Sequence, residues 1–371
     1  MKSKRILALM LALVMALSLA ACGGSKQEEA PADNAGNGEA AGDTQDFGGA
    51  ELVVATWGWA EAGLKTLAAD FESKYNCTIV VDPTSGNGDR LNKLMAEQND
   101  PTADVALLTK SFAQTGNEAG LFEKIDTNIV TSIGDLYDIA VNADGYGPCY
   151  SLCRYGIMYN ADALEKAGLP APTSYEGLFD DQYAHMVALP DMTSTAGPYM
   201  LVARAEAMGG SQEDVTPAMK LMQEKKDNID LWYSTSSDVV NAFTTGEANI
   251  AVFMDINMPS LTDSGLNMVW VDAAEGSFSA PATANVVKNC KNPELAQLFV
   301  EYLISKDTQD KIAEVMNEAP VNKNATMDDS LKTYLAFGDE SMNALKEFDE
   351  AYITANKEAW IDTFQRTVAV Q

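Results

Sequence analysis

The sequence predicts an α/β fold, and two observations support this prediction. Apolar strands alternate with amphipathic helices in the order strand, helix, strand, helix, strand, which is typical of a parallel sheet with helices packed against it. In addition, about 320 residues follow the polar segment that ends at residue 49, and a chain of that length can bury two separate cores. We therefore expect two α/β lobes.

The first alternation of strands and helices covers residues 51–108. Residues 51–56, 77–81 and 104–108 are short apolar runs of the kind found in buried strands. Two segments between them have apolar residues at helical spacing. These residues are Leu64, Leu67, Ala68, Phe71 and Tyr75 in the first segment and Leu91, Leu94 and Met95 in the second.

Two later helices have recognisable ends. Residues 237–246 start with a capping serine and stop at Gly246, and a strand at 249–254 follows directly. Asn292 and Pro293 supply a cap and a first-turn proline for another helix. Its apolar face comprises Leu295, Leu298, Phe299, Tyr302 and Leu303. Residues 328–371 are expected to be helical as well.

Residues 1–21 have the form of a secretory signal peptide. Lys2, Lys4 and Arg5 precede an apolar run at residues 6–21 that is too short to span a bilayer comfortably. The run ends in Leu19-Ala20-Ala21-Cys22, which resembles the bacterial lipobox and so implies cleavage before Cys22 and lipidation of its thiol. An ordinary signal peptide with an incidental cysteine is the alternative. We expect a lipid anchor at the outer face of the cell membrane, or a periplasmic location.

Residues 22–49 are expected to form the lipidated cysteine and a disordered tether. They are rich in small and polar residues, and Phe47 is their only large apolar side chain, so they cannot bury enough surface to fold. The net charge of the whole chain is −29, and loss of the three basic signal residues takes it to −32. Such a charge repels nucleic acid, so we expect no nucleic-acid partner.

The single histidine makes several catalytic classes improbable. His185 stands without a motif around it, whereas a catalytic triad or a histidine-rich zinc site would have to be built on it alone. Cys149 and Cys153 would share a face of a continuous strand but stand too far apart to bridge. With Cys77 and Cys290 they permit three pairings, which stay open here, and buried thiols are the simplest interpretation. We expect no enzymatic activity, no metal and no cofactor.

Five stretches of the chain carry a family resemblance when taken together. They are residues 54–59 (VATWGW), 103–108 (ADVALL), 120–126 (GLFEKID), 146–160 (YGPCYSLCRYGIMYN) and 245–251 (TGEANIA). In this order they resemble the substrate-binding lipoproteins of ATP-driven (ABC) importers. The resemblance is to the broad group that contains spermidine/putrescine-binding and ferric-ion- or phosphonate-binding proteins, and it runs from about residue 51 to residue 323.

The resemblance implies a type II periplasmic-binding-protein fold with the ligand cleft between two lobes. The first lobe would comprise residues 50–153 and 281–325, and the second lobe residues 154–280 and 326–371. It also implies a monomer that closes over a small-molecule solute and delivers it to a membrane permease. The physical argument points to the same cleft, because open α/β sheets bind ligands beyond the carboxyl ends of their strands.

Two tryptophans follow the first strand, where side chains would line the cleft. Trp57 and Trp59 offer rings on which a planar or cationic ligand can stack. Trp57 also falls where the polyamine binders carry a cleft tryptophan. The alternative for both residues is packing in the core.

Two loops have the glycine and hydroxyl character that suits an anion at a helix N-terminus. Ser85 and Gly86 lie between the second strand and the second helix. Thr193, Ser194 and Thr195 precede an apolar helix, and their loop resembles the one used for anions in the ferric-ion and phosphonate members. Simple helix capping is an equal alternative for both loops.

The remaining candidates lie at strand ends and on the crossover. Asp255 and Asn257 follow the strand at 249–254, where Asp255 can pair with an amine or cap a turn. Tyr150 and Arg154 lie on the expected crossover, where Arg154 can clamp a carboxylate or phosphate, or hold an acidic residue across the hinge. The full set of candidate ligand contacts is Trp57, Trp59, Ser85, Gly86, Thr109, Tyr150, Arg154, Thr193, Ser194, Thr195, Asp255 and Asn257.

These residues favour an amine-bearing or zwitterionic ligand, such as a polyamine. An anionic ligand (phosphonate or carboxylate) or ferric ion is the alternative. The chain departs from both subfamilies: residues 275–281 lack the tryptophan and the acidic residue in the positions that polyamine binders use, and the chain has no adjacent tyrosine pair of the ferric-ion kind. A surface sensor or adhesin that binds a partner protein is the alternative class, favoured if the tryptophans lie in the core.

Overall fold

The structure, a computed structural model, describes residues 45–84 and 86–369. The expected signal peptide, Cys22 and nearly all of the tether therefore lie outside the described residues. The strands are β1 (Ala50–Trp57), β2 (Cys77–Thr84), β3 (Val105–Thr109), β4 (Cys149–Asn160), β5 (Val187–Pro190), β6 (Ile229–Tyr233), β7 (Ile250–Met254), β8 (Met268–Val271) and β9 (Phe278–Val286). The helices are α1 (Glu61–Tyr75), α2 (Asn87–Ala96), α3 (Lys110–Glu118), α4 (Ala161–Ala167), α5 (Ala196–Ala207), α6 (Thr216–Glu224), α7 (Ser236–Thr245), α8 (Met258–Thr262), α9 (Pro293–Ile304), α10 (Lys306–Met316), α11 (Gly338–Asn343) and α12 (Glu350–Thr367).

The strands form a mixed sheet in the order β2-β1-β3-β9-β4-β7-β5-β6, and β8 pairs with β4. The first alternation is parallel as predicted, because β1 pairs in parallel with both β2 and β3. A second parallel group consists of β5 with β6 and β7. The two long strands β4 and β9 are antiparallel to each other and join these groups.

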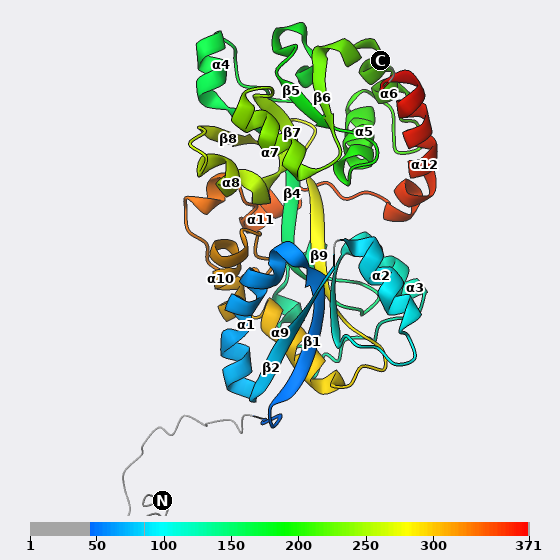
Figure 1. The fold of residues 1–371 in the computed structure, drawn as a ribbon, viewed down its shortest axis with the longest axis vertical. Helices are drawn as coiled ribbons and strands as arrows, with labels where there is room; N and C mark the ends of the chain where they lie inside the picture. The colour runs from blue at the N-terminus through cyan, green and yellow to red at the C-terminus, as the bar shows by residue number, and fades with distance from the viewer. Residues whose placement is uncertain (1–44, 85, 370–371) are drawn as a thin grey trace, which may run out of the picture. The chain divides into compact units, whose positions relative to one another are not determined.

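Two lobes follow from this order and are visible in Figure 1. We call the part with β1, β2, β3, α1, α2, α3, α9 and α10 the first lobe, and the part with β5–β8, α4–α8 and α12 the second lobe. Strands β4 and β9 run from one lobe into the other, and the segment that contains α11 lies beside them (Figure 1). This segment is tied to β9 by hydrogen bonds from Lys346 N to Ser277 O and from Ser279 N to Lys346 O. The α/β fold class is thus confirmed.

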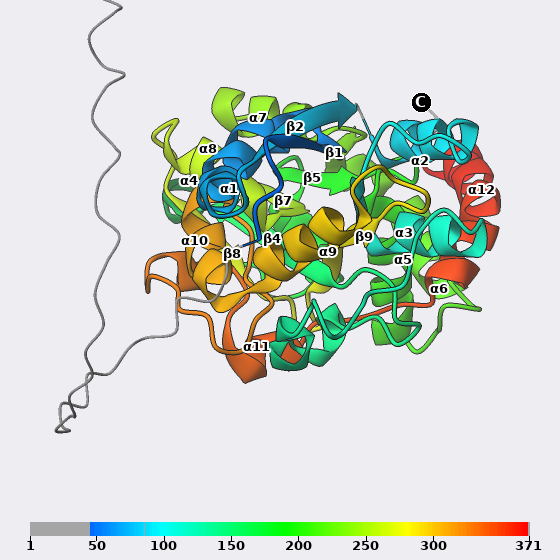
Figure 2. The same cartoon turned by 90° about the horizontal axis from the view of Figure 1, so that it is seen from below.

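Helices cover both faces of the strands in the first lobe. Figures 1 and 2 both place α1 on one side of β1 and β2, and α2 and α3 on the other side. On the α1 side the rings of Phe71 and Phe299 meet edge to face, with their centroids 5.1 Å apart. This layered arrangement buries the apolar strands on both faces, as their unbroken apolar runs require.

The cores of the two lobes are less separate than the chain length suggested. One cluster of buried side chains fills the first lobe and continues through Met158 on β4 to Phe243 on α7 and Phe253 on β7. A second cluster fills the other face of the second lobe, where the ring of Trp232 meets Phe364 of α12 edge to face at 5.1 Å. Because β4 belongs to both lobes, side chains on one of its faces connect the two cores.

The predicted helix ends are confirmed within one or two residues. Helix α7 starts one residue before Ser237, so the prediction of Ser237 as its cap was wrong, and Thr235 with Asp238 forms the capping box instead. Gly246 ends the helix as predicted, at a φ of +78° that favours glycine. Pro293 opens α9 as predicted. The Asn292 side chain makes no capping bond there and donates to the carbonyl of Glu51 instead.

The four cysteines among the described residues, Cys77, Cys149, Cys153 and Cys290, are all free and buried. This agrees with the interpretation of them as small apolar side chains. Over residues 45–84 and 86–369, none of the helices has the length and apolar character needed to cross a membrane.

Candidate functional site

The carboxyl ends of the parallel strands bring the predicted loops of each lobe together. Because β1, β2 and β3 are parallel, the residues after them share one edge of the sheet, and Trp57 at the end of β1 pairs with Thr84 at the end of β2. In the second lobe, β5 is parallel to β6 and β7, so Asp191, Ser234 and Asp255 follow strands that end at a common edge. This is where an α/β sheet presents a ligand site.

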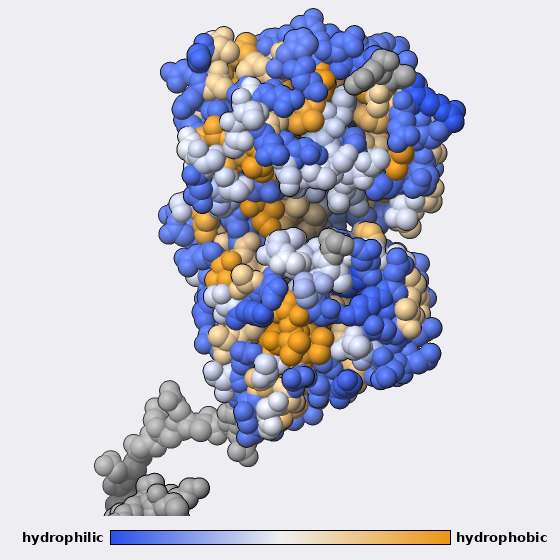
Figure 3. Space-filling model, viewed as in Figure 1, coloured by the Kyte–Doolittle hydropathy of each residue, from blue (hydrophilic) through white to orange (hydrophobic). Residues whose placement is uncertain are grey.

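A pocket of about 240 Å³ lies between these ends. The first lobe contributes the starts of α2 and α3, and the second lobe contributes the starts of α5 and α12. Figure 3 shows the surface hollowed between the two lobes. The lining residues are Asn87, Thr109, Lys110, Ser111, Phe112, Thr195, Pro198, Tyr199, Pro281, Glu350, Ile353, Thr354 and Lys357.

Lys110 links the two lobes beside this pocket. It is the first residue of α3, and its Nζ lies 2.9 Å from Glu347 Oε1, in the segment that leads into α12. The same ammonium donates to the carbonyl of Ile139 at 3.4 Å. The charge of Lys110 is therefore already balanced within the protein.

Tyr199 fixes the start of α12 against α5. Its hydroxyl donates a hydrogen bond to Glu350, the first residue of α12. Burial raises the pKa of both the Tyr199 phenol and the Glu350 carboxyl. The contact places a carboxylate at the wall of the pocket, where a helix N-terminus favours negative charge.

The two tryptophans have different environments. Trp57 is 9% exposed, its ring lies 5.8 Å from that of Trp59, and the buried guanidinium of Arg90 lies 4.6 Å from it. Trp59 is 55% exposed. Trp57 is therefore mostly buried beside Trp59, and the exposed ring of Trp59 forms an aromatic platform.

The loop of the second lobe is bound mainly to itself. Asp191 accepts hydrogen bonds from the Thr193 hydroxyl and from the backbone of Thr193 and Ser194. The Ser194 hydroxyl donates to Asp191 O and accepts from Gly197 N, in the first turn of α5. Gly197 is needed here, because a Cβ at that position would lie 1.9 Å from Asp191 O. Thr193 and Ser194 thus serve the helix start, and Thr195 lines the pocket.

Asp255 and Arg154 lie in the interior beside β4, and not at the cleft edge where Asp255 was expected. Asp255 is fully buried, and it accepts hydrogen bonds from the backbone of Arg154 and Ile256. Arg154 Nε lies 3.6 Å from Asp255, and its other nitrogens donate to Asp272 at 2.6 Å and to the Tyr334 carbonyl at 2.9 Å. This is the structural alternative for Arg154, an arginine that holds acidic residues across the crossing strands.

Burial also changes the acidity of the carboxyls near the crossing. It raises the pKa of Asp255 to about 7, although the neighbouring Arg154 charge opposes the shift. Glu318, which accepts from the Cys153 thiol, is buried too, and its pKa is raised to about 7 for the same reason. These groups hold protons at pH values where a surface carboxyl is ionised.

The other candidates are divided between interior and cleft. Tyr150 is fully buried, and the Asn257 amide donates to the carbonyl of Met254. Gly86 precedes α2, and Thr109 lines the pocket and precedes α3. Ser85 and Cys22 lie outside the described residues.

Lys110 and the residues of α12 line the pocket but were not among the candidates predicted from the sequence. Glu350 and Lys357 are seven residues apart and share one face of a helix, but this spacing is also common on solvated helices. Nothing in the sequence showed that α12 would return to the cleft. The position of α12 is determined by contacts between residues that are distant in the sequence, such as Trp232 and Phe364.

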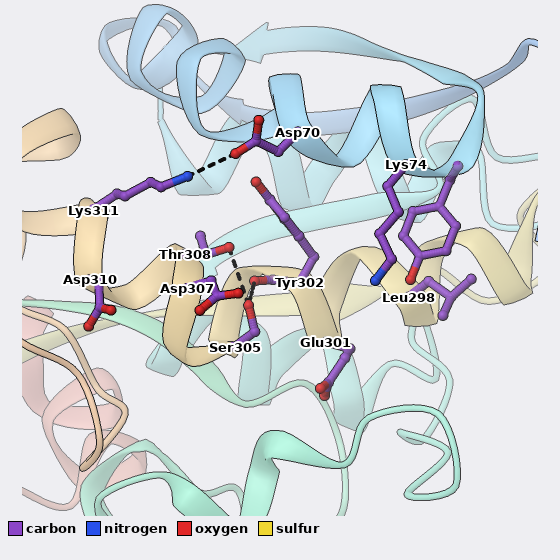
Figure 4. A pocket seen from close by; sticks show the side chains of 11 residues that line it. Asp70, Lys74, Leu298, Glu301, Tyr302, Ser305, Asp307, Thr308, Asp310 and Lys311 are labelled. Carbon is purple, nitrogen blue, oxygen red and sulfur yellow. Dashed lines mark hydrogen bonds and ion pairs between the residues drawn. The ribbon is translucent and has the colours of Figure 1, made fainter. Parts of the chain in front are cut away.

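A second pocket, of about 490 Å³, lies in the first lobe between α1, α9 and α10 (Figure 4). Several of its charged groups already have partners in the protein, since Lys311 pairs with Asp70 at 2.8 Å and Glu301 accepts hydrogen bonds from Ser132. Ser305 and Thr308 hydrogen-bond at the start of α10. We therefore interpret this pocket as a gap left by the packing of α1, α9 and α10.

No group of three or more His, Cys, Asp or Glu side chains within residues 45–84 and 86–369 is arranged to hold a metal ion.

Two α/β lobes joined by β4 and β9, with a pocket at their strand and helix ends, define the class of two-lobe periplasmic binding proteins. The chain belongs to the family of bacterial extracellular solute-binding proteins, whose profile matches residues 66–338. Members of this class bind small solutes for ABC importers and are not enzymes.

Known proteins with similar sequence or structure agree with this assignment. The thiamine-binding periplasmic protein of Escherichia coli (strain K12) is 24% identical over 308 residues, which is 81% of this chain and 86% of that protein. A crystal structure of an ABC transporter from Clostridium perfringens ATCC 13124 superposes with a TM-score of 0.74 at 31% identity, over 85% of this chain and 99% of that chain. The spermidine/putrescine substrate-binding protein of Streptococcus pneumoniae has a TM-score of 0.73 at 16% identity, over 86% and 99%, and so shares the fold.

Proposed function

We propose that the protein captures an amine-bearing or zwitterionic solute in the cleft between its lobes and delivers it to the permease of an ABC importer. The observation that carries this proposal is the pocket lined by both lobes, with the exposed ring of Trp59 at the same sheet edge. A polyamine fits the cationic part of this description. Thiamine, the solute named for the Escherichia coli relative, fits it as a planar cation.

Closure over the solute follows from the same geometry. A ligand that touches α3 from the first lobe and α5 from the second gains both sets of contacts only when the lobes are together. Its binding energy then selects the closed state from the ensemble of open and closed forms. We propose lobe boundaries at residues 50–153 with 281–325, and 154–280 with 326–371, and a monomeric receptor.

An anionic solute, or ferric ion, is the second candidate ligand. The starts of α2 and α3 favour a negative group, since no side chain among the described residues makes a capping bond there. The start of α5 is less suitable, because the Ser194 hydroxyl already accepts a hydrogen bond from Gly197 N. Arg154 no longer supports this candidate, because its guanidinium is engaged by Asp272 and Tyr334. A surface sensor or adhesin remains the alternative class.

A thermal-shift screen of residues 45–371 tests the proposal. Polyamines, thiamine, amino acids, betaines, phosphonates, organic acids and ferric ion are added in turn, and a specific ligand raises the melting temperature as its concentration exceeds Kd. A hit among amines or zwitterions, with compaction in small-angle scattering, supports the first candidate. A hit only among anions moves the assignment to the helix starts, and a folded protein that binds none of them contradicts solute capture.

We further propose that Cys22 carries the lipid anchor and that the protein lies at the outer face of the cell membrane or in the periplasm. The support is the lipobox-like sequence before Cys22. Replacing Cys22 with Ser should release the protein into the soluble fraction in its host. Unchanged membrane association and the absence of a lipid mass increment would contradict it.

A further inference from the structure

Three charged side chains line the interlobe pocket, and they differ in whether the protein already balances them. Lys110 is paired with Glu347 at 2.9 Å. Glu350 accepts one hydrogen bond from the neutral Tyr199 phenol, and Lys357 has no ion-pair or hydrogen-bond partner among the described residues. One negative and one positive group are therefore left to face a ligand.

Glu350 and Lys357 are positioned by a single element. Both lie on α12, and residues seven apart fall on the same face of a helix, about 10.5 Å apart along its axis. Ile353, from the turn between them, is buried and lines the same pocket. The wall thus presents a carboxylate, an apolar stretch and an ammonium group in line.

The other described residues of the pocket bring no further charged side chain without a partner. Its other polar contributors are hydroxyls and one amide, such as Thr109, Ser111 and Asn87. Asp255, for which pairing with an amine or capping of a turn were the two alternatives, is buried in the interior beside Arg154. Glu350 is therefore the acidic group that remains available to an amine in this pocket.

We infer that α12 selects the ligand, and that the ligand is a zwitterion whose ammonium meets Glu350 and whose carboxylate meets Lys357 across an apolar spacer. This inference rests on the proposed function and narrows its ligand class. A diamine would bring a second cation to Lys357, and a dicarboxylate would bring a second anion to Glu350. Each of these ligands would place two like charges next to each other in a half-buried site. Such repulsion lowers the affinity for the wrong ligand and so contributes to specificity.

The direct test uses probes that differ only in their terminal charges. Putrescine, 4-aminobutanoate and succinate form a four-carbon series, and hexane-1,6-diamine, 6-aminohexanoate and adipate form a six-carbon series. Affinities for the folded domain are measured by calorimetry and thermal shift. We expect the amino acid of at least one series to bind about tenfold or more tightly than its diamine and its dicarboxylate. A diamine or dicarboxylate that binds as well as the amino acid overturns the inference.

Charge reversal in the protein supplies the second readout. Lys357→Glu should transfer the preference from the amino acid to the diamine of equal length, because both ends of the wall are then acidic. Lys220→Glu, on the outer helix α6 where the lysine side chain is 70% exposed, changes the net charge by the same amount and should leave the preference unchanged. An unchanged preference in Lys357→Glu, in a protein with native melting temperature, overturns the role of α12.

Failure of this inference can be separated from failure of the proposed function. If no probe binds, the folded domain is incubated with a small-molecule extract of the growth medium, washed and denatured, and the released compound is identified by mass spectrometry. A released zwitterion supports the inference, and a released polyamine, thiamine or dianion overturns it while leaving solute capture intact. A domain that releases nothing and binds no probe overturns both.

Discussion

Arg154 on β4 and Lys357 on α12 are both cations close to the place where the lobes meet, but their surroundings differ. The Arg154 side chain is 4% exposed and is held by Asp272, Tyr334 and Asp255. Lys357 is half-buried and lines the pocket without a partner among the described residues. A cation close to the junction of the lobes can therefore be fully paired within the protein, as Arg154 is, or left without a partner among the described residues, as Lys357 is.

The largest expected effect comes from removing the scaffold cation. Arg154→Met leaves Asp255 and Asp272 without their partner, and an uncompensated buried charge costs about 3–5 kcal/mol in free energy of unfolding. The loss should be greatest above the Asp255 pKa of about 7, where the carboxyl is ionised. Urea denaturation measures it. Arg366→Met, at a side chain 75% exposed, is the control and should change little. Equal losses of stability in Arg154→Met and Arg366→Met would contradict the view that the buried arginine stabilises the fold more than an exposed one.

The next largest effect is expected in the pH dependence of the free energy of unfolding. In the folded state Asp255 and Glu318 have pKa values of about 7, so between about pH 4 and pH 7 the folded protein holds protons that the unfolded chain has released. The free energy of unfolding must therefore fall as pH rises through this window, by roughly 3 kcal/mol per group. Denaturation at a series of pH values measures the slope.

The variant Glu318→Gln isolates one of the two groups. It removes the share of Glu318, so the curve should become flatter between about pH 4 and pH 7. Glu358→Gln, on the exposed side of α12, is the control and should keep the wild-type slope. A wild-type slope in Glu318→Gln would show that this buried carboxyl is ionised throughout.

A smaller effect is expected at the exposed aromatic platform. Trp59→Ala removes a ring that is 55% exposed, so folding should be nearly unchanged while affinity for an amine-bearing ligand falls by about tenfold, the loss of one stacking or cation–π contact. Calorimetry with the ligand found in the screen measures it. Met95→Ala, at an exposed apolar residue on α2, should leave affinity unchanged. Loss of stability with unchanged affinity would place Trp59 with the scaffold.

The smallest effect is expected at the ion pair between the lobes. Lys110→Ala breaks the contact with Glu347, and a half-exposed pair contributes about 0–1 kcal/mol, so the balance of open and closed forms should shift by less than about fivefold towards open. Small-angle scattering without ligand, at low and high salt, measures the shift. Lys65→Ala, which breaks an exposed pair within α1, should leave the scattering unchanged. Identical scattering of wild type and Lys110→Ala would show that the pair does not contribute to closure.

The fold was more predictable than the site, for physical reasons visible in particular residues. The spacing of Leu64, Leu67 and Phe71 predicts the buried face of a helix. The apolar run at residues 51–56 predicts a strand that is buried on both faces. Such patterns depend on neighbours in the sequence. They therefore predicted the elements and the parallel order of β1, β2 and β3.

Whether a polar side chain lies in the cleft or in the interior depends on contacts with residues that are distant in the sequence. Asp255 lies in the interior, where the backbone N–H of Arg154, about a hundred positions earlier, donates to its carboxylate. Thr193 and Ser194 turn to Asp191 because the start of α5 requires their hydrogen bonds. Glu350 reaches the cleft because Phe364 and Trp360 anchor α12 in the second core. These pairings have no local signature, so the sequence left both alternatives open.

The position of α12 also has a consequence for the order in which the protein matures. Synthesis proceeds from the N-terminus, so both parallel strand groups and the crossing strands exist before residue 350 is made. A chain cut short before Glu350 would retain every strand of the sheet but lack one wall of the pocket. The interlobe pocket is therefore complete only after the last long helix has docked.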